Sequence, residues 1–339
     1  MDLAKVKQPR TLIVTGSDKA HYALAADLAA TFRANYGSNY QFAFLNFSPT
    51  ELPGDLAGQF DAIVDVSADY HLFDKAMGYY TAFSAAKARL PELVPGFDCY
   101  CWIDADCWFQ GSESLPRILQ CVEDFDICIH PEYDPHYFKF PTPNPRTIAI
   151  YARNEPELDV ELLHRPMFNA GVFAMMKSSK IWALWQAALA DLRRRHQAGE
   201  DVYFSDQIPL HRILHTSEIS IFPLRAIDNW QTYACTPRID PDAKLLCVPT
   251  PPHEVIGLLH LAGQTKDLIL SGEAGQRFTL RYRDVRNYLD GQAAFYAQAL
   301  AATLPSTKSI LQPSAEAPPN PRPNRWKRFR RALFQNSRE

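Results

Sequence analysis

Two aspartates that directly follow an apolar run are the clearest chemical feature of this 339-residue chain. Asp104 and Asp106 are separated by one alanine, and the segment Tyr100–Ile103 before them predicts a buried strand of a parallel sheet. The carboxyl end of such a strand opens into the crevice where α/β sheets bind ligands. Two carboxylates there repel each other unless a cation lies between them. Because Mg²⁺ and Mn²⁺ prefer carboxylate and phosphate oxygens, we interpret the pair as a metal and diphosphate site.

The same motif also fits a surface turn that contains two aspartates by chance, and on the motif alone the two interpretations have equal weight. A second apolar run, Cys107–Phe109, follows the aspartates at once. This apolar context on both sides favours the site, as do polar groups later in the chain.

The first strand and turn predict an α/β framework around this site. A β-branched strand at Thr11–Thr15 breaks at Gly16-Ser17-Asp18, and a helical pattern follows. This order is that of the opening unit of nucleotide-binding α/β proteins. The turn lacks the glycine patterns of Rossmann dinucleotide sites and of P-loops. Ser17 or Asp18 also suits the N-cap of the helix, and capping and ligand binding can coexist.

Strands and helices alternate along the rest of the chain. Further strands are expected at 41–47, 62–66, 126–130, 168–176, 219–222 and 255–261. Helices are expected at 79–90 (with Lys87), 115–122, 179–196, from Ser205-Asp206 onward, and at 282–302. The alternation predicts an α/β fold with a Rossmann-like, mainly parallel sheet flanked by helices.

Composition excludes several classes of protein. The content of 47% hydrophobic and 22% charged residues is typical of a soluble globular chain. No apolar run approaches the ~20 residues that span a bilayer, and the polar start lacks a signal-peptide core. We therefore expect a cytoplasmic protein. The seven cysteines have neither disulfide-framework nor zinc-ligand spacing, which predicts buried thiols in a reducing compartment.

Three motifs stand in an order that points to a known family. They are Asp104-Ala105-Asp106 at a strand end, Asn169-Ala170-Gly171-Val172 followed by Asp206-Gln207, and His260-Leu261-Ala262-Gly263-Gln264-Thr265-Lys266. With them, roughly residues 10–270 resemble the GT-A fold glycosyltransferases, most closely glycosyltransferase family 8, whose members are retaining enzymes that use UDP-sugars. The chain departs from the family after Lys266, where Asp267-Leu268 replaces the usual Pro-Trp, and at Ile208, where an acidic residue is frequent. These departures weaken any transfer of sugar specificity.

The resemblance implies a ligand set for the metal and the diphosphate. Asp104, Asp106 and His260 would hold Mn²⁺ or Mg²⁺, and a neutral imidazole suits Mn²⁺ better than Ca²⁺. A lone histidine at a strand end is more often structural, but the glycine and lysine that follow favour a ligand. Lys266 would add a positive charge to the same phosphates, with Gly263 and Ala105 beside them.

The resemblance also implies residues around the donor sugar and nucleotide. Asp206 and Gln207 would lie on the face of the sugar opposite the leaving group, and an amide is a poor nucleophile, so Gln207 is expected to stabilise positive charge. Asn169 and Ala170 would contact sugar hydroxyls. Lys87 would pair with the diphosphate or the sugar, unless it is a solvated helix lysine. The turn formed by Thr15, Gly16, Ser17 and Asp18 would hold uridine and ribose.

The expected domain organisation is a catalytic domain at 1–303, a proline-rich linker at 304–324 and a basic tail at 325–339. Within the domain, residues 131–166 are rich in proline and aromatics, which fits an acceptor-binding lid or an irregular packed excursion equally well. In the tail, Trp326, Phe329 and Leu333 share one helical face among arginines. Such a helix favours binding to the anionic inner face of the cell membrane over a disordered, solubilising tail or incidental binding of polyanions. Liposome binding that is lost on deletion of 322–339 would support the membrane interpretation.

The sequence therefore predicts a metal-dependent glycosyltransferase that moves a hexose from a UDP-sugar to a saccharide or glycolipid, with no nucleic acid partner. A nucleotide-sugar-binding protein without turnover is one alternative. Another is an Asp-x-Asp metal enzyme that acts on phosphate esters. HAD-type phosphatases need Thr or Val where Trp108 stands, and nucleotidylyltransferases need a glycine-rich first loop.

Overall fold

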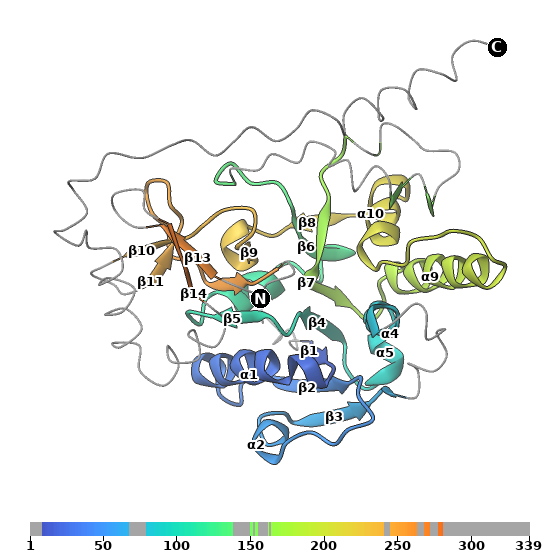
Figure 1. Cartoon of the computed structure of the whole chain (residues 1–339), viewed down its shortest axis with the longest axis horizontal. Coiled ribbons are helices and arrows are strands. Elements are labelled where there is room, and N and C mark those ends of the chain that lie inside the picture. Colours follow the sequence, from blue (N-terminus) through green and yellow to red (C-terminus); the bar gives the residue numbers. More distant parts are fainter. Residues whose placement is uncertain are drawn as a thin grey trace, which may run out of the picture. The chain divides into compact units, whose positions relative to one another are not determined.

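A seven-stranded sheet forms the centre of the computed structural model, with the strand order β3-β2-β1-β4-β7-β6-β8 (Figure 1). The structure describes residues 9–67, 79–137, 150–151, 153–154, 162, 164–240, 245–262, 268–271 and 277–280. The strands of this sheet are β1 (Thr11–Ser17), β2 (Gln41–Asn46), β3 (Ala62–Asp65), β4 (Cys99–Ile103), β6 (Ile127–Pro131), β7 (Phe168–Met176) and β8 (Ile221–Pro223). The α-helices are α1 (Tyr22–Tyr36), α2 (Gly54–Ala57), α4 (Tyr79–Lys87), α5 (Leu90–Leu93), α6 (Ser114–Leu119), α9 (Ile181–Gln197) and α10 (Gln207–Thr216), and the 3₁₀ helices are η1 (Lys19–His21) and η2 (Ala226–Asp228).

The sheet is mainly parallel, as expected, but one central strand runs the other way. Strands β3, β2, β1 and β4 are parallel to one another, whereas β7 is antiparallel to both β4 and β6. The start of β7 therefore lies beside the carboxyl end of β4, and the backbone N–H of Asp104 donates to the carbonyl of Gly171 at 2.7 Å. Because β7 is antiparallel, the motif Asn169-Ala170-Gly171-Val172 lies beside the Asp104-Ala105-Asp106 motif.

Side-chain alternation along the strands produces one core on each face of the sheet. In β1, Leu12 and Val14 face a core that also contains Trp182 and Trp185 of α9. Ile13 faces the opposite core, together with Phe32 of α1. Because both faces of the inner strands are covered, β1, β2, β4 and β7 are buried along nearly their whole length rather than alternately polar.

In the described part of the chain, two smaller sheets accompany the central one. A three-stranded sheet has the order β5-β12-β9, with β5 at Cys107–Phe109, β12 at Leu258–His260 and β9 at Trp230–Gln231. A four-stranded sheet has the order β11-β10-β13-β14, with β10 at Arg238–Asp240, β11 at Leu245–Cys247, β13 at Leu268–Ser271 and β14 at Arg277–Leu280. In the three-stranded sheet, β12 pairs with β5, so that His260 lies beside the segment that directly follows Asp106.

Several local predictions are corrected. Strand β1 continues through Gly16 to Ser17 instead of ending at Thr15. Neither Ser17 nor Asp18 caps a helix with its side chain: Asp18 precedes η1 without a capping bond, and its carboxylate lies 2.6 Å from Nδ1 of His21. Helix α4 ends at Lys87, and a separate short helix begins at Leu90 with a proline in its first turn, where the missing N–H costs nothing.

Some predictions lie outside the described residues. These are Gly263, Lys266, most of 131–166, the helix at 282–302, the linker at 304–324 and the basic tail at 325–339, and they stay predictions. Within the described part of the chain, no helix has the length and hydropathy required to cross a membrane. None of the seven cysteines, all of which are among the described residues, forms a disulfide bond; six are buried, and Cys121 is partly exposed.

Candidate active site

The site is a cleft at the carboxyl ends of β1 and β4. Its empty volume is about 880 Å³, open solvent at the mouth included, which is within the range of small-molecule sites. Side chains from separate elements line it. The lining residues are Gly16, Ser17, His21, Leu24, Phe83, Lys87, Asp104, Ala105, Asp106, Asn169, Ala170, Gly171, Asp206, Gln207, His260 and Ala262.

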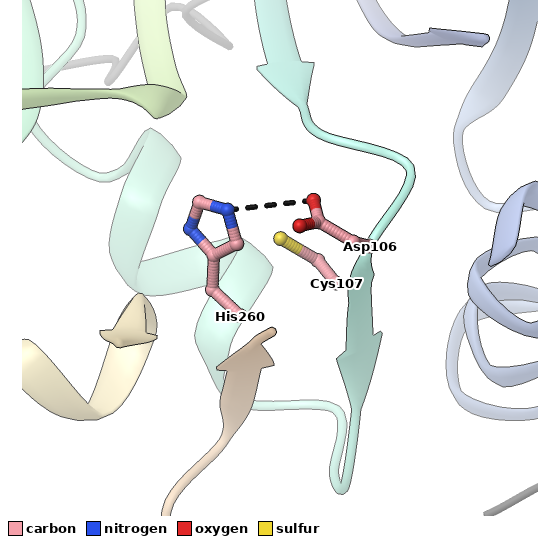
Figure 2. A group of neighbouring side chains, drawn as sticks. All are labelled: Asp106, Cys107 and His260. Atoms are coloured by element: carbon pink, nitrogen blue, oxygen red, sulfur yellow. Dashed lines mark ion pairs between the residues drawn. The ribbon is translucent and has the colours of Figure 1, made fainter. Parts of the chain in front are cut away.

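His260 and the two aspartates converge in this cleft. Figure 2 shows His260 beside Asp106 and Cys107. The imidazole Nε2 lies 3.4 Å from Oδ1 of Asp106 and 3.8 Å from Oδ2 of Asp104. Strand pairing is the cause. Strand β12 runs antiparallel to β5, and His260 at the end of β12 lies opposite Cys107, the residue after Asp106. The backbone N–H of Leu261 donates to the carbonyl of Asp106 at 2.9 Å and fixes this register.

A hydrogen-bond chain sets which nitrogen of His260 faces the aspartates. The backbone N–H of Gly171 donates to Oδ1 of Asn169 at 3.0 Å, which identifies that atom as the oxygen. Asn229 must then donate its Nδ2 to the same oxygen (3.0 Å) and turn its own Oδ1 toward Nδ1 of His260 at 2.9 Å. Nδ1 therefore carries the proton. In the neutral imidazole the lone pair on Nε2 is directed at Asp104 and Asp106, as a metal ligand requires.

The same chain extends to Gln207. The amide nitrogen of Asn169 donates to Oε1 of Glu132 at 3.2 Å, and Nε2 of Gln207 donates to the same oxygen at 2.9 Å. Because its nitrogen is engaged by Glu132, Gln207 presents its amide oxygen as the group available to a ligand. Gln207 begins α10, whose N-cap is Asp206.

Lys87 links the two acidic motifs. Its Nζ lies 2.9 Å from Oδ1 of Asp104 and 2.9 Å from Oδ2 of Asp206, and it donates to the carbonyl of Ala170 at 3.1 Å. The lysine side chain is only 2% exposed. Burial lowers the pKa of Lys87, but attraction to the two carboxylates outweighs it and raises that pKa above its ordinary value. The ammonium is thus a fixed charge within the protein.

Among the described residues that line the cleft, the three aspartates outnumber the single lysine. Burial raises the pKa of Asp104 above its ordinary value, Lys87 opposes this shift, and the neighbouring charge of Asp106 adds to it. Lys87 must also balance Asp206, and within the described part of the cleft one ammonium is set against three carboxylates. A divalent ion would add positive charge here.

The space at Gly171 supports a metal at this place. A Cβ atom there would lie 2.3 Å from Cε1 of His260 and 2.8 Å from both Oδ2 of Asp104 and Oδ1 of Asn169. Only glycine lets these groups come together. With two carboxylates and one oriented imidazole, the donor set fits Mn²⁺ or Mg²⁺.

The predicted nucleotide turn is only partly at the cleft. Gly16 and Ser17 line it, whereas Thr15 and Asp18 do not. Among the described residues, the buried hydroxyl groups of Thr15 and Ser17 have no hydrogen-bond partner. A buried hydroxyl without a partner costs free energy, so that of Ser17, at the cleft wall, is suited to a polar ligand atom. Gly16 itself is required by packing, because a Cβ there would lie 2.7 Å from the carbonyl oxygen of Leu45.

The structure brings together all the predicted site residues that it describes except Thr15 and Asp18. It also adds residues that the sequence did not single out, namely Glu132, Asn229, His21 and Cys107. Asn229 lies 31 positions before His260 in the chain, and Glu132 lies 75 positions before Gln207. No spacing rule connects such distant residues, and none of the sequence motifs contains Asn229 or Glu132.

Comparisons with known proteins give fold-level neighbours of low similarity. No protein-family model matches the chain, and no curated protein matches it. Among solved structures, the galactosyltransferase LgtC with donor and acceptor sugar analogs is 15% identical over 75% of this chain and 88% of that chain, with a TM-score of 0.46. An active-site mutant of LgtC is 14% identical over the same shares, with a TM-score of 0.47. Apo mouse xyloside xylosyltransferase 1 is 15% identical over 65% of this chain and 87% of that chain, with a TM-score of 0.44. Similarity at this level does not assign an activity to this chain.

Proposed function

We propose that this chain is a metal-dependent glycosyltransferase that transfers a hexose from a UDP-sugar to a saccharide or glycolipid acceptor with retention of anomeric configuration. The observation that carries the proposal is the convergence of Asp104, Asp106 and His260 in a cleft that also contains Gln207. When bound, Mn²⁺ or Mg²⁺ would supply Lewis-acid stabilisation of the departing diphosphate. The remaining work falls to the protein's own side chains.

Gln207 is placed to stabilise positive charge on the sugar. Its amide nitrogen is held by Glu132, so its oxygen can face an anomeric carbon that develops oxocarbenium character. Asp206 is less suited to attack that carbon. One of its oxygens accepts from the backbone N–H of Gln207 at 2.9 Å, and the other pairs with Lys87. These bonds lower the nucleophilicity of the carboxylate and support a mechanism without a covalent Asp206 intermediate.

The nucleotide would lie along the end of β1. Ser17 offers a buried hydroxyl to ribose or uracil, and Gly16 lets the backbone of β1 pass close to β2. Lys87 would contribute chiefly by balancing Asp104 and Asp206, so any contact with the donor would be shared with these carboxylates. Asn169 and Ala170 would border the sugar.

The test is UDP-sugar hydrolysis followed across a panel of donors with Mn²⁺ and with a chelator. Asp106→Asn should reduce the Mn²⁺-dependent rate by at least about 100-fold, the order of loss seen when one electrostatic stabiliser is removed. Asp124→Asn, which changes an exposed aspartate, is the matched control and should retain the rate. The anomeric configuration of the product, read by NMR, tests retention.

Other outcomes favour the alternatives. Tight binding of a UDP-sugar with no turnover on any acceptor would favour a binding protein. Hydrolysis of simple phosphate esters in preference to UDP-sugars would favour a phosphoesterase. An Asp106→Asn rate equal to that of the unchanged protein would contradict the metal assignment.

A further inference from the structure

Cys107 lies at the proposed metal site, beside Asp106 and His260. The sulfur Sγ of Cys107, one oxygen of Asp106 and one nitrogen of His260 all lie within 4.8 Å of one another. All three residues are buried. Figure 2 shows the thiol directed toward the space between the imidazole and the carboxylate.

Strand pairing makes this juxtaposition a property of the fold. Cys107 begins β5 and is the direct antiparallel partner of His260 at the end of β12. Side chains of opposed residues in an antiparallel pair leave the same face of the sheet, with Cβ atoms about 4.5–5.5 Å apart. The thiol and the imidazole are therefore neighbours by register, and Asp106 is adjacent in sequence.

The spacing suits a small tetrahedral ion. Bonds of 2.0–2.3 Å to oxygen, nitrogen and sulfur place pairs of tetrahedral ligand atoms roughly 3.3–3.8 Å apart. Nε2 of His260 and Oδ1 of Asp106 are already 3.4 Å apart. A side-chain rotation that moves Sγ by about an ångström completes this geometry, since the three atoms lie within 4.8 Å.

We infer that Asp106, Cys107 and His260 form a second coordination mode of the site, selective for thiophilic divalent ions such as Zn²⁺ and Co²⁺. The thiol proton passes to solvent as the metal–sulfur bond forms, so no oxidant or reductant is involved. A hard ion such as Mn²⁺ prefers the oxygens of Asp104 and Asp106, whereas sulfur favours the softer ion. An ion in this second mode competes with Mn²⁺ for Asp106 and His260. The inference rests on the proposed metal site.

Titration of the full chain with Co²⁺, followed by near-ultraviolet absorption, tests this directly. Thiolate ligation gives a sulfur-to-cobalt charge-transfer band. The unchanged protein should show the band, and added Zn²⁺ should abolish it by displacement. Cys107→Ser should lose the band and weaken Co²⁺ binding by at least the roughly 10-fold that loss of an outer-shell partner costs. Cys121→Ser removes a partly exposed thiol elsewhere and should keep it.

The outcomes separate this inference from the proposed function. Mn²⁺ binding, measured by electron paramagnetic resonance, combined with a Co²⁺ complex that lacks the band would overturn the inference alone. Persistence of the band in Cys107→Ser would overturn it as well. Failure of every ion to bind would remove the metal site and the proposed function together. Circular dichroism of Cys107→Ser, matched to that of the unchanged protein, shows that a lost band does not come from unfolding.

Discussion

Asn229 does not line the cleft, but its side chain sets the tautomer of His260, which does. It is completely buried, accepts from Nδ1 of His260 and donates to Asn169. Partners of this kind fix the tautomer and the orientation of a metal-binding imidazole. Without Asn229, the proton on the His260 ring is free to move to Nε2, where it would block the lone pair that faces Asp104 and Asp106.

Asn229→Ala should therefore weaken Mn²⁺ binding by about 10- to 100-fold, the usual effect of losing an outer-shell partner. Isothermal titration with Mn²⁺ measures the change. Asn154→Ala is the matched control, because Asn154 is equally buried and hydrogen-bonded but lies outside the site, against Tyr203. Both variants should lose stability, and only Asn229→Ala should lose metal affinity. Equal metal affinities in the two variants would contradict the positioning role.

At the scale of elements, Lys87 connects three segments that are far apart in the sequence. It ends α4 and pairs with Asp104 after β4 and with Asp206 before α10. Removal of one member of a buried ion network leaves uncompensated charge. The network thus holds the two acidic motifs in place before any ligand arrives.

Lys87→Met should destabilise the metal-free protein by about 3 to 5 kcal/mol, because two partly buried carboxylates lose their counter-charge. Urea unfolding in the presence of a chelator measures the loss. Combining Lys87→Met with Asp206→Asn should recover part of it, since one of the two unpaired charges is then gone. Lys177→Met, at an exposed position, serves as the control and should change stability by less than about 0.5 kcal/mol. If the losses of unfolding free energy caused by Lys87→Met and Asp206→Asn simply add in the double variant, the network is ruled out.

The sequence predicted the positions of the strands and helices well, but it predicted less well in which direction a strand runs and which side chains meet. The apolar run at Phe168–Met176 identified β7, but a run buried on both faces carries no sign of its direction, and β7 proved antiparallel. Lys87 was placed on a helix from periodicity, yet its carboxylate partners come from two other elements. The convergence of Asp104, Asp106 and His260 followed from motif resemblance, whereas Asn229 and Glu132 act through contacts that no motif contains.

At the scale of the whole molecule, buried histidines couple stability to pH. His130, at the end of β6, is fully buried between the carbonyl of Leu224 and the hydroxyl of Tyr137. Burial lowers the pKa of His130 to about 4 from its usual 6.5. Burial also lowers the pKa of His211 to about 4. Between pH 6.5 and about pH 4, these two histidines are therefore protonated in the unfolded chain but not in the folded chain.

Stability should therefore be constant with respect to these groups above pH 6.5 and should fall as the pH drops from 6.5 toward 4. The contribution of His130 over this interval is about 3 kcal/mol, from about 1.4 kcal/mol per unit of pKa difference. Urea unfolding at pH 7 and at pH 4.5 measures the slope. His130→Gln should flatten it, whereas His164→Gln, at an exposed position, should leave it unchanged. Equal slopes in the two variants would contradict the assignment.

The pairing of β12 with β5 has a consequence for how this protein could lose its chemistry. Successive residues of a strand point to opposite faces, so a slip of β12 by a single position would turn the imidazole of His260 away from the carboxylates. A strand that has slipped by one position can still pair with its neighbours through backbone hydrogen bonds. A one-residue deletion between η2 and β12 would then yield a folded, stable and chemically silent protein.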